Sequence, residues 1–232
     1  MSMKDGVRAT ASAAAAKAAA ARAALQYVTT GMVIGVGSGT TAAAFIDALR
    51  EWTGPCPVAA VASSEETARL LRAIGMDVTP LPPSGHIQLY VDGADTADGD
   101  LRLIKGHGGA HAREKVLASA AGLFVCIMDE TKGATSLVGQ TVPVEYLPMA
   151  RSFVAGEVEK IGGRLVHREG FLTDNGNDIS DVHDLDLSDP GYMEGRLEEI
   201  PGVVACGIFA RRPADVLLVG HSDGTVDTHR RG

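Results

Sequence analysis

Three short segments of the chain place glycines beside hydroxyl, acidic or basic side chains. They are GVGSGTT at Gly35–Thr41, DGAD at Asp92–Asp95 and KGHGGAHAREK at Lys105–Lys115. Glycines let backbone N–H groups approach an anion closely, and carboxylates can transfer protons or bind metal ions. These residue types predict a site for a small anionic ligand, with groups that could move a proton on it.

The loop Gly35–Thr41 predicts phosphate binding, with a plain tight turn as the alternative. It lies between an apolar run and a helix-like segment, so its N–H groups and the helix start would face an anion. The hydroxyls of Ser38, Thr40 and Thr41 add donors that a plain turn does not need. NAD binding is disfavoured, because a dinucleotide loop has glycine where Thr40 stands and an acid where Ser63 ends the next strand.

Asp92 and Asp95 follow an apolar strand and face each other's charge, which would raise the pKa of at least one of them. Metal binding or proton transfer would use such a pair, and a turn with a helix cap is the alternative. Lys105 places a cation beside a glycine run. Glu114, on the helix that follows, could act as a general base if partly removed from water, or be a solvated acid in a first turn.

The histidines and cysteines give weaker signals. His107 and His111 are four residues apart, but nothing completes a metal set at suitable spacing, so we predict no metal site. Cys56, Cys126 and Cys206 lie far apart without a C-x-x-C motif, so a reducing cytosol fits better than a disulfide framework.

Apolar runs alternate with helix-like segments as far as residue 130. This order predicts an α/β fold, a parallel sheet with helices on both faces whose strand ends gather the three segments. From Val142 the order becomes strand–helix–strand–strand–helix–strand, which predicts a small ferredoxin-like α+β unit. A strand in 214–220 would return to the first sheet, and 226–232 would be a frayed tail. The expected domains are 1–136 with 208–232, and 137–207.

Composition limits the classes of partner. The 232 residues carry a net charge of −8, so a nucleic-acid or membrane-surface binder, which needs a basic face, is disfavoured. The alanine-rich stretch 9–24 is interrupted by Lys17 and Arg22 and predicts a helix rather than a signal peptide or membrane span.

Eight segments resemble the A-type ribose-5-phosphate isomerases in order and across nearly the whole chain: AALQYV, GVGSGTTAAAFI, DGAD, LIKGHGGAHAREK, DETK, VPVEYLP, FLTDNGN and IPGVVACGIFA. The resemblance implies a Rossmann-like domain with an inserted α+β lobe. It also implies interconversion of ribose 5-phosphate and ribulose 5-phosphate through an enediolate, in the pentose phosphate pathway. The enzyme would need no metal or cofactor and would be a cytoplasmic homodimer or homotetramer.

The resemblance also assigns roles by position. Glu114 matches the general base, Asp92 and Asp95 match the pair for ring opening and the sugar hydroxyls, and Lys105 matches the lysine that stabilises charge on the sugar oxygens. The family usually has glycine where His107 stands, so this side chain either narrows the sugar pocket or points outward. The further substrate-binding positions are Lys17, Ser38, Gly39, Thr40, Thr41, Gly93, Ala94, Gly106, His107, Gly108 and Lys132.

Two other functions are alternatives to an isomerase. A sugar-phosphate sensor of similar fold would add a basic helix-turn-helix, whereas the first 30 residues carry only Lys4, Arg8, Lys17 and Arg22 in an alanine-rich helix. A related-fold transferase or deaminase would use a glutamate nucleophile or base. The complete set of DGAD, Lys105 and Glu114 favours isomerisation over both.

Overall fold

The computed structural model describes the backbone of residues 3–231 and the side chains of residues 12–231. The chain forms two compact units. The parallel-sheet unit contains residues 1–94, 120–132 and 214–232, and the α+β unit contains residues 95–119 and 133–213. Residues 95–119, which the expected domains placed with the first unit, therefore group with the second. The reason is that a short strand at Leu103–Ile104 pairs with the strand Ile208–Phe209 on one side and with the strand Thr96–Ala97 on the other.

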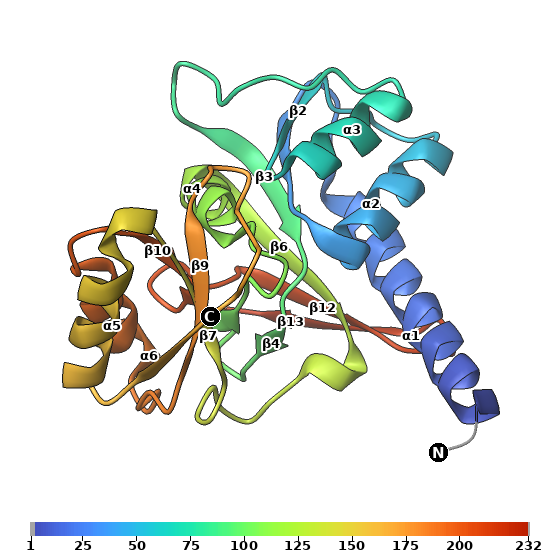
Figure 1. Ribbon diagram of the computed structural model, residues 1–232. Coiled ribbons are helices and arrows are strands. Elements are labelled where there is room, and N and C mark those ends of the chain that lie inside the picture. Colours follow the sequence, from blue (N-terminus) through green and yellow to red (C-terminus); the bar gives the residue numbers. More distant parts are fainter. Residues whose placement is uncertain (1–2, 232) are drawn as a thin grey trace. The chain divides into compact units, whose positions relative to one another are not determined.

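The sheet of the parallel-sheet unit has the order β13-β12-β6-β3-β1-β2 (Figure 1). All neighbours run parallel except β13, which is antiparallel to β12. The order reverses between β1 and β3, and the carboxyl ends of strands at such a switch point are where ligands bind in α/β folds. Its strands are β1 (Val33–Val36), β2 (Ala59–Ala62), β3 (Ile87–Asp92), β6 (Ala121–Asp129), β12 (Val216–Gly220) and β13 (Val226–Arg230).

The parallel sheet and the return of β12 confirm the sequence prediction, whereas the expected frayed tail at 226–232 is wrong. Val226–Arg230 form a full ladder with β12, from Val216↔Arg230 to Gly220↔Val226. Four of the five β13 residues are exposed. An edge strand of this kind needs no apolar alternation, so its sequence looks like a solvated tail.

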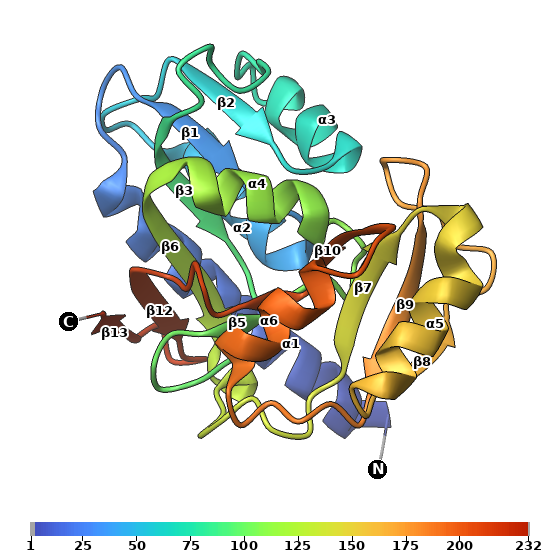
Figure 2. The same ribbon diagram turned by 90° about the vertical axis from the view of Figure 1, so that its left-hand side faces the viewer.

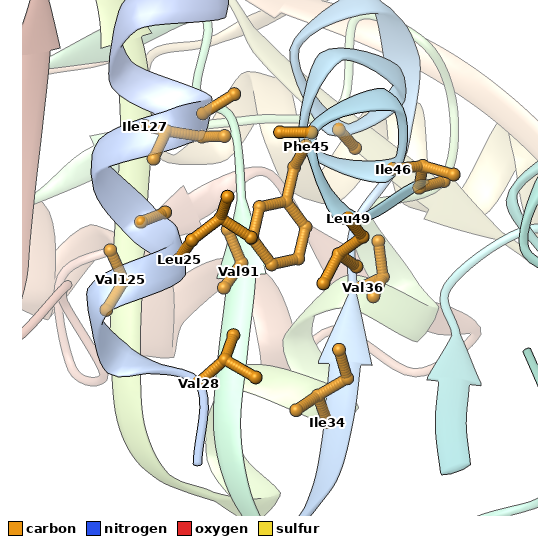
Figure 3. Packing of buried hydrophobic residues seen from close by; sticks show 14 of the residues in the cluster. Leu25, Val28, Ile34, Val36, Phe45, Ile46, Leu49, Val91, Val125 and Ile127 are labelled. Atoms are coloured by element: carbon orange, nitrogen blue, oxygen red, sulfur yellow. The ribbon is translucent and has the colours of Figure 1, made fainter. Parts of the chain in front are cut away.

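Helices α1 (Met3–Ala24) and α2 (Gly39–Glu51) pack together on the sheet, and Figure 3 shows the Phe45 ring of α2 among Leu25, which directly follows α1, and side chains of the strands. Ala16, Ala20 and Ala24 of α1 are buried at four-residue spacing, and a Cβ added to Gly220 would lie 2.0 Å from the Ala16 carbonyl oxygen. The small side chains thus let α1 approach the sheet closely. The unit's other helical segments are η1 (Leu25–Tyr27), α3 (Glu65–Ala73) and η2 (Glu130–Lys132).

The α+β unit contains the expected ferredoxin-like arrangement, with antiparallel strand order β10-β7-β9-β8. Figure 2 shows α5 beside these strands, and the apolar side chains of α5 and α6 share one core with them. The elements are β7 (Val142–Tyr146), η3 (Pro148–Ala150), α5 (Arg151–Lys160), β8 (Arg164–His167), β9 (Asp178–His183), α6 (Pro190–Glu198) and β10 (Val203–Cys206).

The same unit holds a three-stranded sheet that the sequence did not predict, with the order β11-β5-β4. Its strands are β4 (Thr96–Ala97), β5 (Leu103–Ile104) and β11 (Ile208–Phe209), and α4 (His111–Ala120) follows β5. The segment VVACGIFA, expected as one strand, is divided at Gly207 into β10 and β11. Among residues 3–231, no helix has the length and apolar character needed to cross a membrane.

Candidate functional site

The turn from β1 to α2 is the glycine loop for which we predicted phosphate binding. Its Gly37 N–H donates to the Val91 carbonyl (2.9 Å), and the Thr67 hydroxyl donates to the Gly37 carbonyl (2.7 Å). A Cβ added to Gly37 would lie 1.8 Å from the carboxyl carbon of Asp92, so only glycine fits. α2 begins at exposed Gly39 and Thr40, where its first N–H groups and its dipole can meet an anion.

Asp92 ends β3 beside this loop and is buried. Its carboxylate accepts hydrogen bonds from the backbone N–H groups of Ser38 (3.2 Å) and Gly93 (2.7 Å), and from the Tyr90 hydroxyl. Thr41 is buried as well, and a Cβ added to Gly93 would lie 3.0 Å from the Thr41 Cβ. The carboxylate therefore has a fixed orientation at the carboxyl edge of the parallel sheet.

Two lysines of the parallel-sheet unit lie near these segments. Lys17 of α1 donates to the Thr40 hydroxyl (3.1 Å), and its Nζ is 3.9 Å from Oδ2 of buried Asp129. Lys132 donates to the Ala94 carbonyl (2.6 Å). The structure thus places one predicted lysine on the glycine loop and the other on the DGAD segment.

The α+β unit brings Lys105 and Glu114 together. Their Nζ and Oε2 atoms are 3.0 Å apart, and each side chain is only 4% exposed. The Lys105 N–H donates to the Gly207 carbonyl (2.9 Å), and its ammonium lies 5.6 Å from the centre of the Phe209 ring. Because a carboxylate in this position is shielded from water, the alternative of a solvated first-turn acid is wrong. The lysine offsets the cost of burying the carboxylate.

Asp95 is held by His107. Its Oδ2 accepts the His107 backbone N–H (3.0 Å) and lies 3.4 Å from the ring Nδ1. Although burial opposes it, the hydrogen bonds from His107 lower the pKa of Asp95 to about 2. The raised pKa expected from a facing carboxylate is therefore not found at Asp95. The His107 ring is about half exposed, and its hydrogen bond to Asp95 raises its pKa.

Comparisons with known proteins show which family the chain belongs to. The sequence model of the family described as Ribose 5-phosphate isomerase A (phosphoriboisomerase A) matches residues 59–224. The chain is 50% identical over 208 residues to ribose-5-phosphate isomerase A of Acidithiobacillus ferrooxidans, covering 88% of this chain and 93% of that protein. The chain belongs to the ribose 5-phosphate isomerase A family.

Solved structures of the family share the fold. The ribose 5-phosphate isomerase A of Neisseria gonorrhoeae superposes with a TM-score of 0.89 at 39% identity, covering 93% of this chain and 96% of that one. The enzyme of Methanocaldococcus jannaschii gives 0.84 at 35% identity, covering 92% and 97%. Ribose 5-phosphate isomerases interconvert ribose 5-phosphate and ribulose 5-phosphate, which favours this activity over the sensor and the transferase or deaminase.

His111 and Cys206 are buried, and neither is in a charged form that would bind a ligand. His111 is buried, and its Nε2 lies 3.1 Å from the Ala205 carbonyl. Burial lowers the pKa of His111 to about 4, so the neutral ring donates Nε2–H to that carbonyl. Burial also raises the pKa of the Cys206 thiol to about 11, which disfavours a thiolate. Among the described residues, no three His, Cys, Asp or Glu side chains form a group that could hold a metal.

Sequence reasoning missed residues that hold the predicted ones in place. Tyr90, which donates to Asp92, stands two residues earlier on β3, and alternate residues of a strand share a face. That spacing could have identified it. Phe209, under the Lys105 ammonium, is 104 residues away from it in the sequence. No local pattern indicates such a contact.

Proposed function

We propose that Glu114 carries the proton between C2 and C1 when this chain interconverts ribose 5-phosphate and ribulose 5-phosphate. Moving the carbonyl from C1 to C2 requires removal of the C2 proton, an enediolate, and return of a proton to C1. One carboxylate can perform both transfers on one face of the sugar. The observation that supports Glu114 is its buried carboxylate, 3.0 Å from the Lys105 ammonium.

Lys105 is proposed to stabilise the enediolate. Negative charge develops on the oxygens of C1 and C2 as the C2 proton leaves, and a cation in a water-poor environment stabilises that charge strongly. The ammonium already pairs with the base, so proton uptake by Glu114 frees it to interact with the sugar oxygens. Asp92 and Asp95 are proposed to assist ring opening and to bind the sugar hydroxyls.

The glycine loop is proposed to hold the phosphate. Support comes from the N–H groups at the start of α2, the hydroxyls of Ser38, Thr40 and Thr41, and Lys17 on Thr40. Lys132 and the remaining predicted contact residues, Gly93, Ala94, Gly106, His107 and Gly108, are assigned to the sugar. Binding energy from the phosphate, which does not react, would orient the carbons that do.

The test is Glu114→Gln, which keeps the size of the side chain but removes the base. We expect kcat to fall about 10²–10⁴-fold, the range for one acid–base group, with KM changed only a few-fold. Glu66→Gln is the matched control, since Glu66 lies in the first turn of α3 but is exposed and paired with Arg69. A near-normal rate in Glu114→Gln would remove Glu114 from this role.

NMR of ribose 5-phosphate with the protein in D₂O checks the chemistry directly. Ketose carrying deuterium at C1 is expected, because the transferred proton can exchange with solvent on the carboxylate. Binding without ketose would instead indicate a sensor. We also propose a cytoplasmic homodimer or homotetramer, as the family resemblance implies, and light scattering of the purified chain gives the subunit number.

A further inference from the structure

Arg168 lies outside the residues considered so far and reaches the glycine run after Lys105. It directly follows β8 in the α+β unit. Its Nη1 donates to the carbonyl of His107 (2.8 Å) and, more weakly, to that of Gly106 (3.4 Å). A side chain that is 61 residues away from His107 in the sequence thus holds the backbone of the loop.

The guanidinium is itself fixed by Asp181 of β9. Nε donates to Oδ2 (2.8 Å) and Nη2 to Oδ1 (2.7 Å), while the two side chains are 17% and 24% exposed. Such bidentate pairing sets the plane of the guanidinium as well as its position. The remaining nitrogen, Nη1, is therefore directed at the loop rather than free to rotate.

The loop residue that Arg168 holds is also the one that binds Asp95. His107 donates its N–H to the Asp95 carboxylate (3.0 Å), and its carbonyl accepts from Arg168. Gly106, directly before His107, and Gly109, two residues after it, have φ values of +104° and +80°. Glycines in this region have many accessible conformations, so the loop needs external contacts to stay in one of them.

We propose that Arg168 is a positioning residue for the isomerisation, because it fixes the glycine loop that keeps the His107 N–H on Asp95. The inference rests on the role proposed above for Asp95. Arg168 touches neither Asp95 nor the reacting carbons in this scheme, and it acts through the His107 backbone.

The test measures kcat and KM of Arg168→Met in the parent chain and in Asp95→Asn. We expect kcat/KM to fall about 10-fold in the parent but less than about 2-fold in Asp95→Asn, since residues acting through one another are not additive. Arg168→Lys keeps the charge and one donor and should recover part of the loss. Arg164→Met is the matched control four residues earlier, at the start of β8, where Arg164 forms an exposed pair with Asp184.

The outcomes separate this inference from the proposed function. The positioning role is overturned if Arg168→Met has the same kcat/KM as Arg164→Met. It is also overturned if Arg168→Met lowers kcat/KM as much in Asp95→Asn as in the parent chain. If Asp95→Asn alone has full activity, the role of Asp95 fails and the inference fails with it. The thermal midpoint of each variant shows whether it folds. If Arg168→Met does not fold, the kcat/KM of Arg168→Lys in the parent chain and in Asp95→Asn tests the positioning role instead.

Discussion

Asp92 and Asp95 belong to one tetrapeptide but are held by different kinds of partner. Asp92, in the parallel-sheet unit, is buried and accepts hydrogen bonds from two backbone N–H groups and a phenol. Asp95, in the α+β unit, is about a quarter exposed and is held by the backbone and ring of His107. The first set of partners does not change charge near neutral pH, whereas the imidazole does.

This difference separates two ways of orienting a carboxylate. Around Asp92 the orientation follows from how closely β1, β3 and the glycine loop approach one another. Around Asp95 it depends on a loop residue and its charge. An added side-chain atom should therefore disturb the orientation of Asp92 most, and a change of pH should disturb the orientation of Asp95 most.

Gly37→Ala should have the largest effect. The added Cβ would lie 1.8 Å from the carboxyl carbon of Asp92, so either the loop or the carboxylate must move. We expect kcat/KM to fall at least about 100-fold and the free energy of unfolding to fall by about 1–3 kcal/mol, as for overpacked cores. Kinetics with ribose 5-phosphate and urea unfolding measure the two effects.

The control for this change is Gly99→Ala, where nothing lies within 4 Å of an added Cβ. It should leave both quantities unchanged. If Gly37→Ala behaved like this control, close approach would not be what orients Asp92.

Tyr90→Phe should have a moderate effect on the same carboxylate. It removes the hydroxyl that donates to Asp92 but keeps the ring, whose centre is 4.9 Å from that of Phe124. Loss of one hydrogen bond to a buried charge should lower the free energy of unfolding by about 1–3 kcal/mol. Tyr192→Phe, at an exposed position, should change nothing. An unaltered stability in Tyr90→Phe would mean that the backbone donors suffice.

Much of the fold follows from local sequence. Apolar runs such as Ile87–Asp92 and Ala121–Asp129 are strands because their residues fill a sheet buried on both sides. β4, β5 and β11 have only two residues each, too few for any periodicity, so β4 and β5 were missed and β11 was expected as part of one strand with β10. They tie 95–119 to the α+β unit, so the expected division of the chain differed there.

The candidate site was chosen from sequence by residue type, and sequence did not show its contacts. Glycine spacing and charge selected Lys105, Glu114 and the glycine loop Gly35–Thr41 as candidates. The partners of the chosen residues could not be found in this way, because Arg168 and Phe209 reach them from 61 and 104 positions away. Nor could spacing show that His107, rather than Asp92, decides the pKa of Asp95.

His107→Ala should have the smallest effect, and the pH dependence of that effect distinguishes Asp95 from Asp92. The pKa of Asp95 is about 2 in the folded chain, below its ordinary 3.8, so its contribution to stability is present above 3.8 and is lost as pH falls toward 2. The pKa of His107 is raised above 6.5, so its contribution is present below 6.5 and is lost as pH rises through the raised value. The pair should therefore stabilise the chain most between these limits.

In urea unfolding, His107→Ala should cost about 1 kcal/mol near pH 5 and less at either side, because solvent screens a pair whose histidine is half exposed. His86→Ala, at an exposed histidine, should cost nothing at any pH. For Tyr90→Phe, the loss should stay constant from about pH 5 to 8, because neither a phenol nor backbone N–H groups titrate there. If His107→Ala caused no loss, the backbone N–H, which alanine keeps, would be sufficient to hold Asp95. A loss that did not change with pH would show that the charge of the ring is not involved, and in either case the contrast between the two carboxylates would disappear.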